Sequence, residues 1–144
     1  MSNEFEKYDA FTKHMEESFP KMFTEPYGGF CVSEGWWPVL ANLCANIQHH
    51  IDWQNKNHEK HPVVPQVVVG QIKEKFGGLR FYYDGGDGAI SGMVRMAEAW
   101  ANNTCETCGA PGKRREGGWI KTLCDTHEAE RQQRMKEYEN QTSQ

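Results

Sequence analysis

Three segments of the chain carry apolar residues at the three- and four-residue spacing of an amphipathic helix. They lie at about residues 4–19, 36–53 and 89–103. Ser33 can cap the second helix, and Pro38 is tolerated in its first turn. Each stripe should face a shared core. The stripes consist of Phe5, Tyr8, Phe11, Met15 and Phe19; of Leu40, Leu43, Cys44, Ile47 and Ile51; and of Ile90, Met93, Val94, Ala97, Trp100 and Ala101.

Between the second and third helices the pattern changes to that of strands. Residues 66–83, QVVVGQIKEKFGGLRFYY, are rich in β-branched and aromatic side chains, with the pair Gly77-Gly78 in the middle. This pattern predicts a β-hairpin with a two-residue turn. Counting outward from the glycines pairs Phe76 with Leu79, Lys75 with Arg80, Glu74 with Phe81, Lys73 with Tyr82 and Ile72 with Tyr83.

The pairing gives the hairpin one apolar face and one basic face, because side chains alternate along a strand. The third helix should cover the apolar face, where Glu74 is expected to reach solvent at a strand end. Lys75 opposite Arg80 is a like-charge pair, and a carboxylate or phosphate partner would relieve the repulsion between the two side chains. The alternative is that this face is only solvated and that its charges keep other strands from pairing with the edge of the sheet. The apolar face carries Ile72, Phe76, Leu79, Phe81 and Tyr83, and the basic face carries Lys73, Lys75, Arg80 and Tyr82.

These elements predict an α+β fold, with a small core of hairpin and helices over residues 1–103. Residues 54–65 are polar and end in two prolines, which favours a connecting loop. At least one of Trp36 and Trp37 is expected in the core, and an exposed recognition patch is the alternative. Residues 104–144 should form a separate module packed on this core.

The C-terminal part contains two pairs of metal-binding residue types. Cys105 and Cys108 are separated by two residues, fifteen residues follow, and Cys124 and His127 are again separated by two. Thiolate and imidazole are the usual protein donors to zinc. The spacing predicts one zinc ion per chain. The ion should be structural, with no catalytic residue, because four protein ligands leave no position for water.

The sequence around these ligands indicates a treble-clef-like zinc module by analogy. Gly109 suits the turn of a zinc knuckle, and Gly117-Gly118 suits a hairpin turn. The residues after the second ligand pair favour a helix, which Asp125 or Thr126 can cap. Knuckle, hairpin and helix follow one another in that order.

A metal-dependent nuclease or hydrolase is an alternative for the same module. The acidic candidates for such chemistry are Glu106, Glu128 and Glu130. The module's only histidine, His127, is already assigned to the metal. This assignment favours the structural role.

A second basic cluster lies between the two ligand pairs. Lys113, Arg114 and Arg115 precede the glycine pair, and Trp119 follows it. Together with the basic hairpin face, these residues form the candidate partner-binding surface. The alternative is that these charged residues lie in a turn and serve only solubility. His49, His50, His58 and His61 are expected to be solvated rather than to form a second metal site.

Composition narrows the classes of protein. The net charge is −4, and 38% of residues are apolar, as is ordinary for a soluble globular chain rather than a dedicated nucleic-acid binder. No segment reaches the roughly 20 apolar residues of a membrane span, and the start of the chain lacks a secretory signal pattern. Five cysteines, three at metal-ligand spacing, fit a reducing compartment. We expect a cytoplasmic protein in which Cys31 and Cys44 are small buried groups.

Two stretches together resemble a family of small uncharacterised proteins of bacteriophages, prophages and some bacteria. The stretches are QIKEKFGGLRFYYDGG with the following AEAW helix, and TCETCGAPG with GWIKTLCDTH. The similarity covers about residues 36–127. Phage accessory proteins of this size often bind a host protein, so the resemblance implies a protein partner in the host cytoplasm.

The expected function is a non-enzymatic, zinc-stabilised binding protein, a phage accessory factor that inhibits or redirects a host protein. One alternative is a nucleic-acid-binding regulator, in which Lys73, Lys75 and Arg80 contact phosphates together with Lys113, Arg114 and Arg115. The metal-dependent hydrolase is the second alternative. The sequence leaves these alternatives open.

Overall fold

The computed structural model describes residues 3–24 and 26–143. Over these residues it has the predicted α+β class, with four α-helices and two small sheets. The helices are α1 (Glu4–Ser18), α2 (Trp37–Lys56), α3 (Gly88–Ala101) and α4 (Asp125–Thr142), and a 3₁₀ turn, Glu34–Trp36, precedes α2. The strands are β1 (Phe30–Cys31), β2 (Val68–Lys75), β3 (Gly78–Asp84), β4 (Lys113–Arg115) and β5 (Lys121–Leu123).

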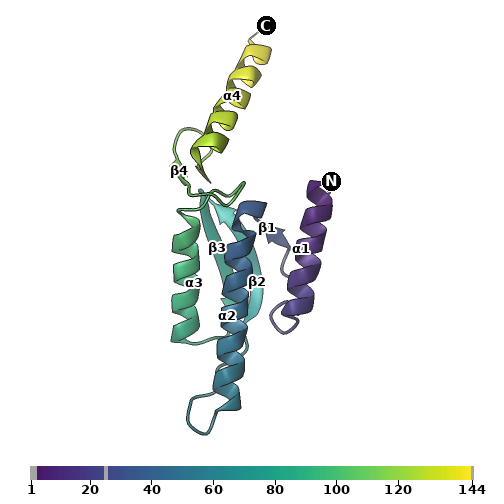
Figure 1. The fold of residues 1–144 in the computed structure, drawn as a ribbon, viewed down its shortest axis with the longest axis vertical. Helices are drawn as coiled ribbons and strands as arrows, with labels where there is room; N and C mark the ends of the chain where they lie inside the picture. The colour runs from purple at the N-terminus through teal and green to yellow at the C-terminus, as the bar shows by residue number, and fades with distance from the viewer. Residues whose placement is uncertain (1–2, 25, 144) are drawn as a thin grey trace.

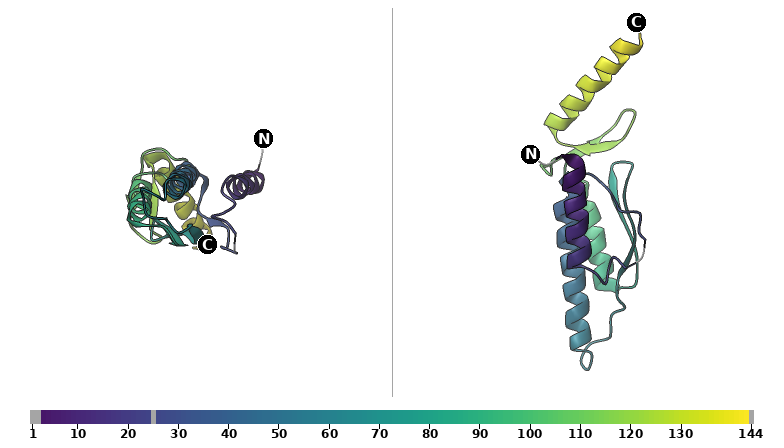
Figure 2. Two further views of the ribbon diagram at one scale, coloured as in Figure 1. Left: turned by 90° about the horizontal axis from the view of Figure 1, so that it is seen from below. Right: turned by 90° about the vertical axis from the view of Figure 1, so that its right-hand side faces the viewer.

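The larger sheet has the order β1-β2-β3, with β1 parallel to β2 and β2 antiparallel to β3. Helices α2 and α3 cover one face of this sheet, and α1 stands beside the edge formed by β1 (Figure 1, Figure 2). The apolar core lies between these layers. Its buried members run from Met15 to Ala101 and include Trp36, Leu40, Ile47, Ile72, Leu79 and Ile90, none of which exposes any of its surface.

The hairpin turn is Phe76-Gly77, and the prediction of Gly77-Gly78 is wrong. Phe76 and Gly77 both have positive φ, 53° and 79°, as a type I′ turn requires. The Glu74 carboxylate accepts a hydrogen bond of 2.7 Å from the backbone N–H of Gly77, which holds the turn in this place. Gly78 therefore enters β3.

The shifted turn changes the cross-strand partners but not the faces. Lys73, not Lys75, is opposite Arg80, and Lys75 is opposite Gly78. The register differs from the predicted one by two positions, and an even shift leaves each side chain on its own face. Phe76 is the exception, because it sits in the turn and is 62% exposed instead of lying on the apolar face.

The helices differ from the predicted ones mainly at their ends. Ser33 makes no side-chain capping bond, and α2 starts later, directly out of the 3₁₀ turn, with Pro38 in its first turn. The cap of α3 is Asp87, whose carboxylate accepts from the backbone N–H of Ile90. Phe5 and Trp100 lie on end turns of their helices beside surface pockets, and both are exposed, contrary to expectation.

Strand β1 is not among the strands predicted from the sequence. Cys31, in β1, is exposed rather than buried, whereas Cys44 is fully buried as expected. Trp36 fills the core, and Trp37 stacks on Phe11 with ring centroids 4.6 Å apart. Among the described residues, no helix combines the length and apolar character that crossing a bilayer demands.

Candidate metal centre

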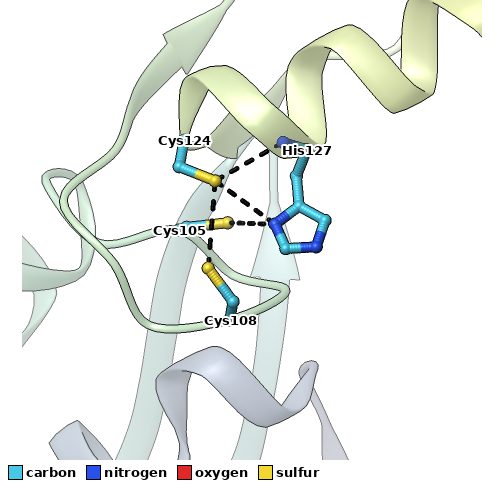
Figure 3. A group of neighbouring side chains, drawn as sticks. All are labelled: Cys105, Cys108, Cys124 and His127. Carbon is cyan, nitrogen blue, oxygen red and sulfur yellow. Dashed lines mark hydrogen bonds between the residues drawn. The ribbon is translucent and has the colours of Figure 1, made fainter.

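The four predicted ligands converge on one point (Figure 3). The ligand atoms of Cys105, Cys108, Cys124 and His127 all lie within 4.8 Å of one another. The Cys108 and Cys124 sulfurs are 3.8 Å apart, and His127 Nδ1 lies 3.6 Å from Cys105 Sγ and 3.2 Å from Cys124 Sγ. This cluster, called the Cys/His cluster below, can bind one metal ion.

The first ligand pair sits on a tight turn. The backbone N–H of Gly109 donates to the carbonyl of Cys105 at 2.8 Å, and the N–H of Cys105 donates to the carbonyl of Ala110 at 2.7 Å. Gly109 has a φ of 83°, in the region that favours glycine. The turn brings the Cys105 and Cys108 sulfurs to the same side.

The second pair sits at the start of α4. Cys124 itself is the N-cap, and its sulfur accepts a hydrogen bond of 3.4 Å from the backbone N–H of His127. The prediction that Asp125 or Thr126 caps this helix is wrong. A ligand at the cap position benefits from the partial positive charge of the helix N-terminus, which favours a thiolate.

Backbone donors favour ionised sulfur in the cluster. Burial raises the pKa of the Cys105 thiol, but hydrogen bonds from the backbone N–H groups of Cys124, Cys108 and Thr107 outweigh burial and lower that pKa to about 6. The N–H of Ala110 favours the Cys108 thiolate, yet burial and the adjacent sulfurs raise its pKa. Ionisation of Cys108 beside the Cys105 thiolate is therefore disfavoured unless a cation lies between the two sulfurs.

The imidazole of His127 is oriented by the helix. Its Nδ1 faces the sulfurs, and its Nε2 points toward the Glu130 carboxylate, which lies 3.9 Å away one turn along α4. A carboxylate on the far nitrogen is a common arrangement for metal-ligating histidines.

Residues 104–143, called the C-terminal module below, continue from the Cys105–Cys108 turn into the β4–β5 hairpin and then α4. Gly117 and Gly118 lie in the hairpin loop with positive φ, as a turn at this glycine pair requires. None of the residues of α4 is buried, and the helix projects away from the rest of the molecule (Figure 1).

One contact between the module and the rest of the chain, called the body below, runs through the segment before α2. The N–H of Gly35 donates to the carbonyl of Glu106 at 2.7 Å, and the Trp36 indole donates to the carbonyl of Thr104 at 2.9 Å. The buried Glu106 carboxylate accepts from the N–H of Ser33 at 3.1 Å and lies 3.6 Å from the Lys121 ammonium. No local pattern in the sequence indicates this role of Glu106.

A second contact joins β5 to the tip of the β2–β3 hairpin. The buried hydroxyl of Thr122 donates to the carbonyl of Gly77 at 2.6 Å. This bond fixes the hairpin turn against the module. The domain boundary at residue 103 stays a prediction, although both contacts lie where the two predicted parts meet.

The basic residues of the module are used unequally. Arg115 donates to the carbonyl of Leu123 and to Asp125 at 2.7 Å, with only 13% of its side chain exposed. Its guanidinium is thus part of the scaffold and is not available to a partner, contrary to expectation. Arg114 is 3.3 Å from Glu116. Lys113 and Trp119 are exposed, Trp119 by 73%.

The predicted basic hairpin face is present on the sheet. Lys73, Arg80 and Tyr82 share one side of the β2–β3 pair, and Tyr82 is 45% exposed. Sequence reasoning missed Phe76 as an exposed residue, because it was assigned to a strand rather than to the turn. Phe76 and Trp119 line one surface pocket, although they are far apart in the sequence.

The remaining histidines lie outside the cluster. His50 Nε2 is 2.9 Å from the Asp87 carboxylate and only 18% of its side chain is exposed, so the prediction that it is solvated is wrong. Desolvation raises the pKa of Asp87, but hydrogen bonds from His50 and from the backbone of Ile90 outweigh it and lower that pKa. This pair ties α2 to the start of α3.

Comparisons with protein-family models, with curated proteins and with solved structures found no match to this chain.

Proposed function

We propose that this protein is a non-enzymatic binding protein stabilised by one structural zinc ion at the Cys/His cluster. The single observation behind this proposal is the convergence of three sulfurs and one imidazole nitrogen within 4.8 Å. Four protein donors fill a tetrahedral site and leave no position for water or substrate. The ion then stabilises structure instead of activating a reactant.

The spacing of the donors suits zinc. Zinc bonds of about 2.3 Å to sulfur and about 2.0–2.1 Å to nitrogen place tetrahedral ligands about 3.8 Å apart for two sulfurs and about 3.6 Å apart for sulfur and nitrogen. The Cys108–Cys124 and Cys105–His127 distances are 3.8 Å and 3.6 Å, and the Cys124–His127 distance is shorter, at 3.2 Å. The order of turn, hairpin and helix supports a treble-clef-like module.

The positions of the acidic side chains in the module favour a structural metal site over a hydrolase active site. Glu106 is buried against Ser33, and Glu128 is bound to Arg131 at 2.8 Å. Glu130 stands behind the metal ligand His127. These positions serve packing and ligand orientation, and neither Glu106 nor Glu128 is free to act on a substrate.

The proposed partner is a host protein, which the protein would inhibit or redirect as a phage accessory factor in the host cytoplasm. This choice is supported by the sequence resemblance, and the exposed Trp119 and Tyr82 are residue types enriched at binding hot spots. The module would then hold Trp119 and its neighbours in a fixed position for recognition.

Two measurements test the proposal. Metal analysis of purified protein should find about one zinc per chain. Capture from a lysate of a bacterial host should retain a stoichiometric partner on the zinc-loaded protein and not on the Trp119→Ala variant. A folded protein without metal, or a capture that retains nothing, contradicts the corresponding half of the proposal.

A second candidate, nucleic-acid binding, is favoured by one observation. Among the described residues, Lys73, Lys75 and Arg80 form no ion pair with a carboxylate. They lie with the exposed rings of Phe76, Tyr82 and Trp119 around the hairpin tip and the module loop. The next subsection develops this observation.

A further inference from the structure

The open side of the hairpin presents cations beside an aromatic ring. Ile72, Leu79 and Phe81 are buried in the core, and α2 and α3 cover one face of the sheet (Figure 2). Side chains alternate along a strand, so Lys73, Arg80 and Tyr82 lie on the face opposite these buried residues. The Lys73 ammonium lies 5.7 Å from the centre of the Tyr82 ring. Lys73 and Arg80 are direct cross-strand neighbours of like charge.

At the hairpin tip this surface continues into the module. Lys75, Phe76 and Trp119 line a surface pocket of about 410 Å³. Phe76 and Trp119 are 62% and 73% exposed, and the Lys75 ammonium lies 5.8 Å from the centre of the Phe76 ring. The hydrogen bond between Thr122 and Gly77 fixes the two walls of the pocket relative to each other. We call Lys73, Lys75, Phe76, Arg80, Tyr82 and Trp119 the basic aromatic surface.

Charge is distributed very unevenly over the chain. Residues 68–83 and 113–123 contain seven Lys or Arg against two Asp or Glu, within a chain whose net charge is −4. In the described part of the chain, no acidic side chain forms an ion pair with Lys73, Lys75, Arg80 or Lys113. A concentrated positive potential at this end of the molecule favours a polyanionic partner.

We propose that the basic aromatic surface binds single-stranded nucleic acid. Bases would stack on Tyr82, Phe76 and Trp119, and Lys73, Lys75 and Arg80 would contact phosphates. Rings that alternate with unpaired cations are the arrangement by which proteins hold single strands without reading sequence. A duplex hides the faces of its bases, so it would use the cations alone. An acidic polypeptide would likewise leave the three rings without stacking partners.

The inference rests on the proposed function, because the zinc-held module supplies Trp119 and one wall of the pocket. It goes beyond the proposed host-protein partner by assigning the basic aromatic surface a different ligand, single-stranded nucleic acid. It assigns to Phe76 a role that its place in a type I′ turn makes easy to test.

The test is a fluorescence-anisotropy titration of full-length zinc-loaded protein with a labelled oligothymidylate of about 16 nucleotides. We expect saturable binding that weakens steeply between about 50 mM and about 200 mM salt, as phosphate contacts require. The same length of duplex should bind at least about tenfold more weakly, since stacking is lost. Equal binding of the duplex, or no binding at low salt, overturns the inference.

Matched variants assign the contacts. Phe76→Asn removes a ring yet keeps the turn, because Asn-Gly is the preferred type I′ pair. Phe76→Asn and Trp119→Ala should each weaken binding about tenfold, the loss of one base stack. Lys75→Glu should lower the salt slope by about one. The controls Phe5→Ala and Lys60→Glu change an exposed ring and an exposed lysine outside the basic aromatic surface and should have no effect. Equal effects of the two sets contradict the assignment.

Two further measurements distinguish the possible reasons for a negative result in the binding test. Polyglutamate is used as a competitor, and displacement of the oligonucleotide at equal charge concentration shows an acidic polypeptide site and overturns the inference. Zinc content and far-ultraviolet circular dichroism are measured on the same sample. Protein that is folded and zinc-loaded but does not bind refutes this inference alone, whereas protein that is folded without zinc refutes the proposed function.

Discussion

The body and the C-terminal module are stabilised by different means. In the described part of the chain, the twenty buried residues of the apolar core all lie between Met15 and Ala101. In the module, the buried apolar residues are Cys105 and Leu123, and α4 has no buried residue among those described. The body folds by removing apolar surface from water, whereas the module has too little of it to do so.

The difference indicates where a metal bound at the Cys/His cluster would act. A module of about 40 residues without its own core needs a metal, a disulfide or docking to a larger unit. This module has the Cys/His cluster and the contacts of Trp36 and Thr122 with their partners across the boundary. We therefore expect loss of the metal to unfold the module and leave the body folded.

The largest effect is expected for Cys124→Ser. Serine is a preferred N-cap, so the variant keeps the cap of α4 and loses only the metal ligand. Zinc binding to small modules contributes about 10–16 kcal/mol to folding, so α4 should lose its helical structure. Circular dichroism and zinc analysis measure both effects. The control is Cys31→Ser, at an exposed cysteine outside the cluster, which should change neither.

The next effect concerns the close contact between body and module at Gly35. A methyl group there would clash with the carbonyl groups of Cys105 and Glu106. Gly35→Ala should lower the free energy of unfolding by about 3 kcal/mol or more, because backbone must move. Gly92→Ala is the control, since Gly92 is helical with open space around it.

Gly92→Ala should instead raise the free energy of unfolding by about 0.5–1 kcal/mol, through the helix propensity of alanine. Urea unfolding followed by circular dichroism gives both values. Similar values for the two substitutions would show that the segment before α2 does not hold the module.

A smaller effect is expected at the second contact. Thr122→Val keeps the shape of the side chain but leaves the Gly77 carbonyl without its buried donor. The free energy of unfolding should fall by about 1–2 kcal/mol. Thr122→Ser restores the hydroxyl and should recover part of the loss. Denaturant unfolding measures the series, and an unchanged Thr122→Val variant would remove this bond from the account.

The smallest effect belongs to the body alone. The lowered pKa of Asp87 means that its charge stabilises the fold above the unfolded pKa of about 3.9, and that this contribution disappears as pH falls through the lower folded pKa. Asp87→Asn keeps a capping acceptor and should cost about 0.5 kcal/mol or less at neutral pH, because Asp87 is partly exposed.

The difference between wild type and Asp87→Asn should shrink in unfolding measurements as pH falls below about 3.9, and it should vanish below the lower folded pKa. Asp87→Ala also removes the cap of α3 and should cost about 1 kcal/mol at either pH. A constant difference between wild type and Asp87→Asn across this pH range would contradict the role of the His50–Asp87 bond.

Local patterns predicted what depends on neighbours in the sequence. The helices and the cluster of Cys105, Cys108, Cys124 and His127 follow from periodicity and ligand spacing, which are local properties. The hairpin turn was placed one residue too late, because a glycine pair favours a turn but does not fix which two residues form it. Glu74 fixes it, through its bond to Gly77.

What the sequence could not predict depends on contacts between distant segments. Strand β1 has two residues and pairs in parallel with β2, so no local alternation marks it. Glu106 is buried because Ser33 and Lys121 meet it from other parts of the chain. The exposed ring of Phe76 beside Trp119 likewise requires the fold to bring the two together.

The central claim, that a metal holds the module and not the body, is tested most directly by hydrogen exchange with and without a zinc chelator. The account predicts that chelation removes protection from the amides of 104–142, while amides around Ile47 and Leu79 in the body remain protected. Zinc content measured on the same sample should fall from about one per chain to none. Unchanged protection of the module after complete metal removal would contradict the claim.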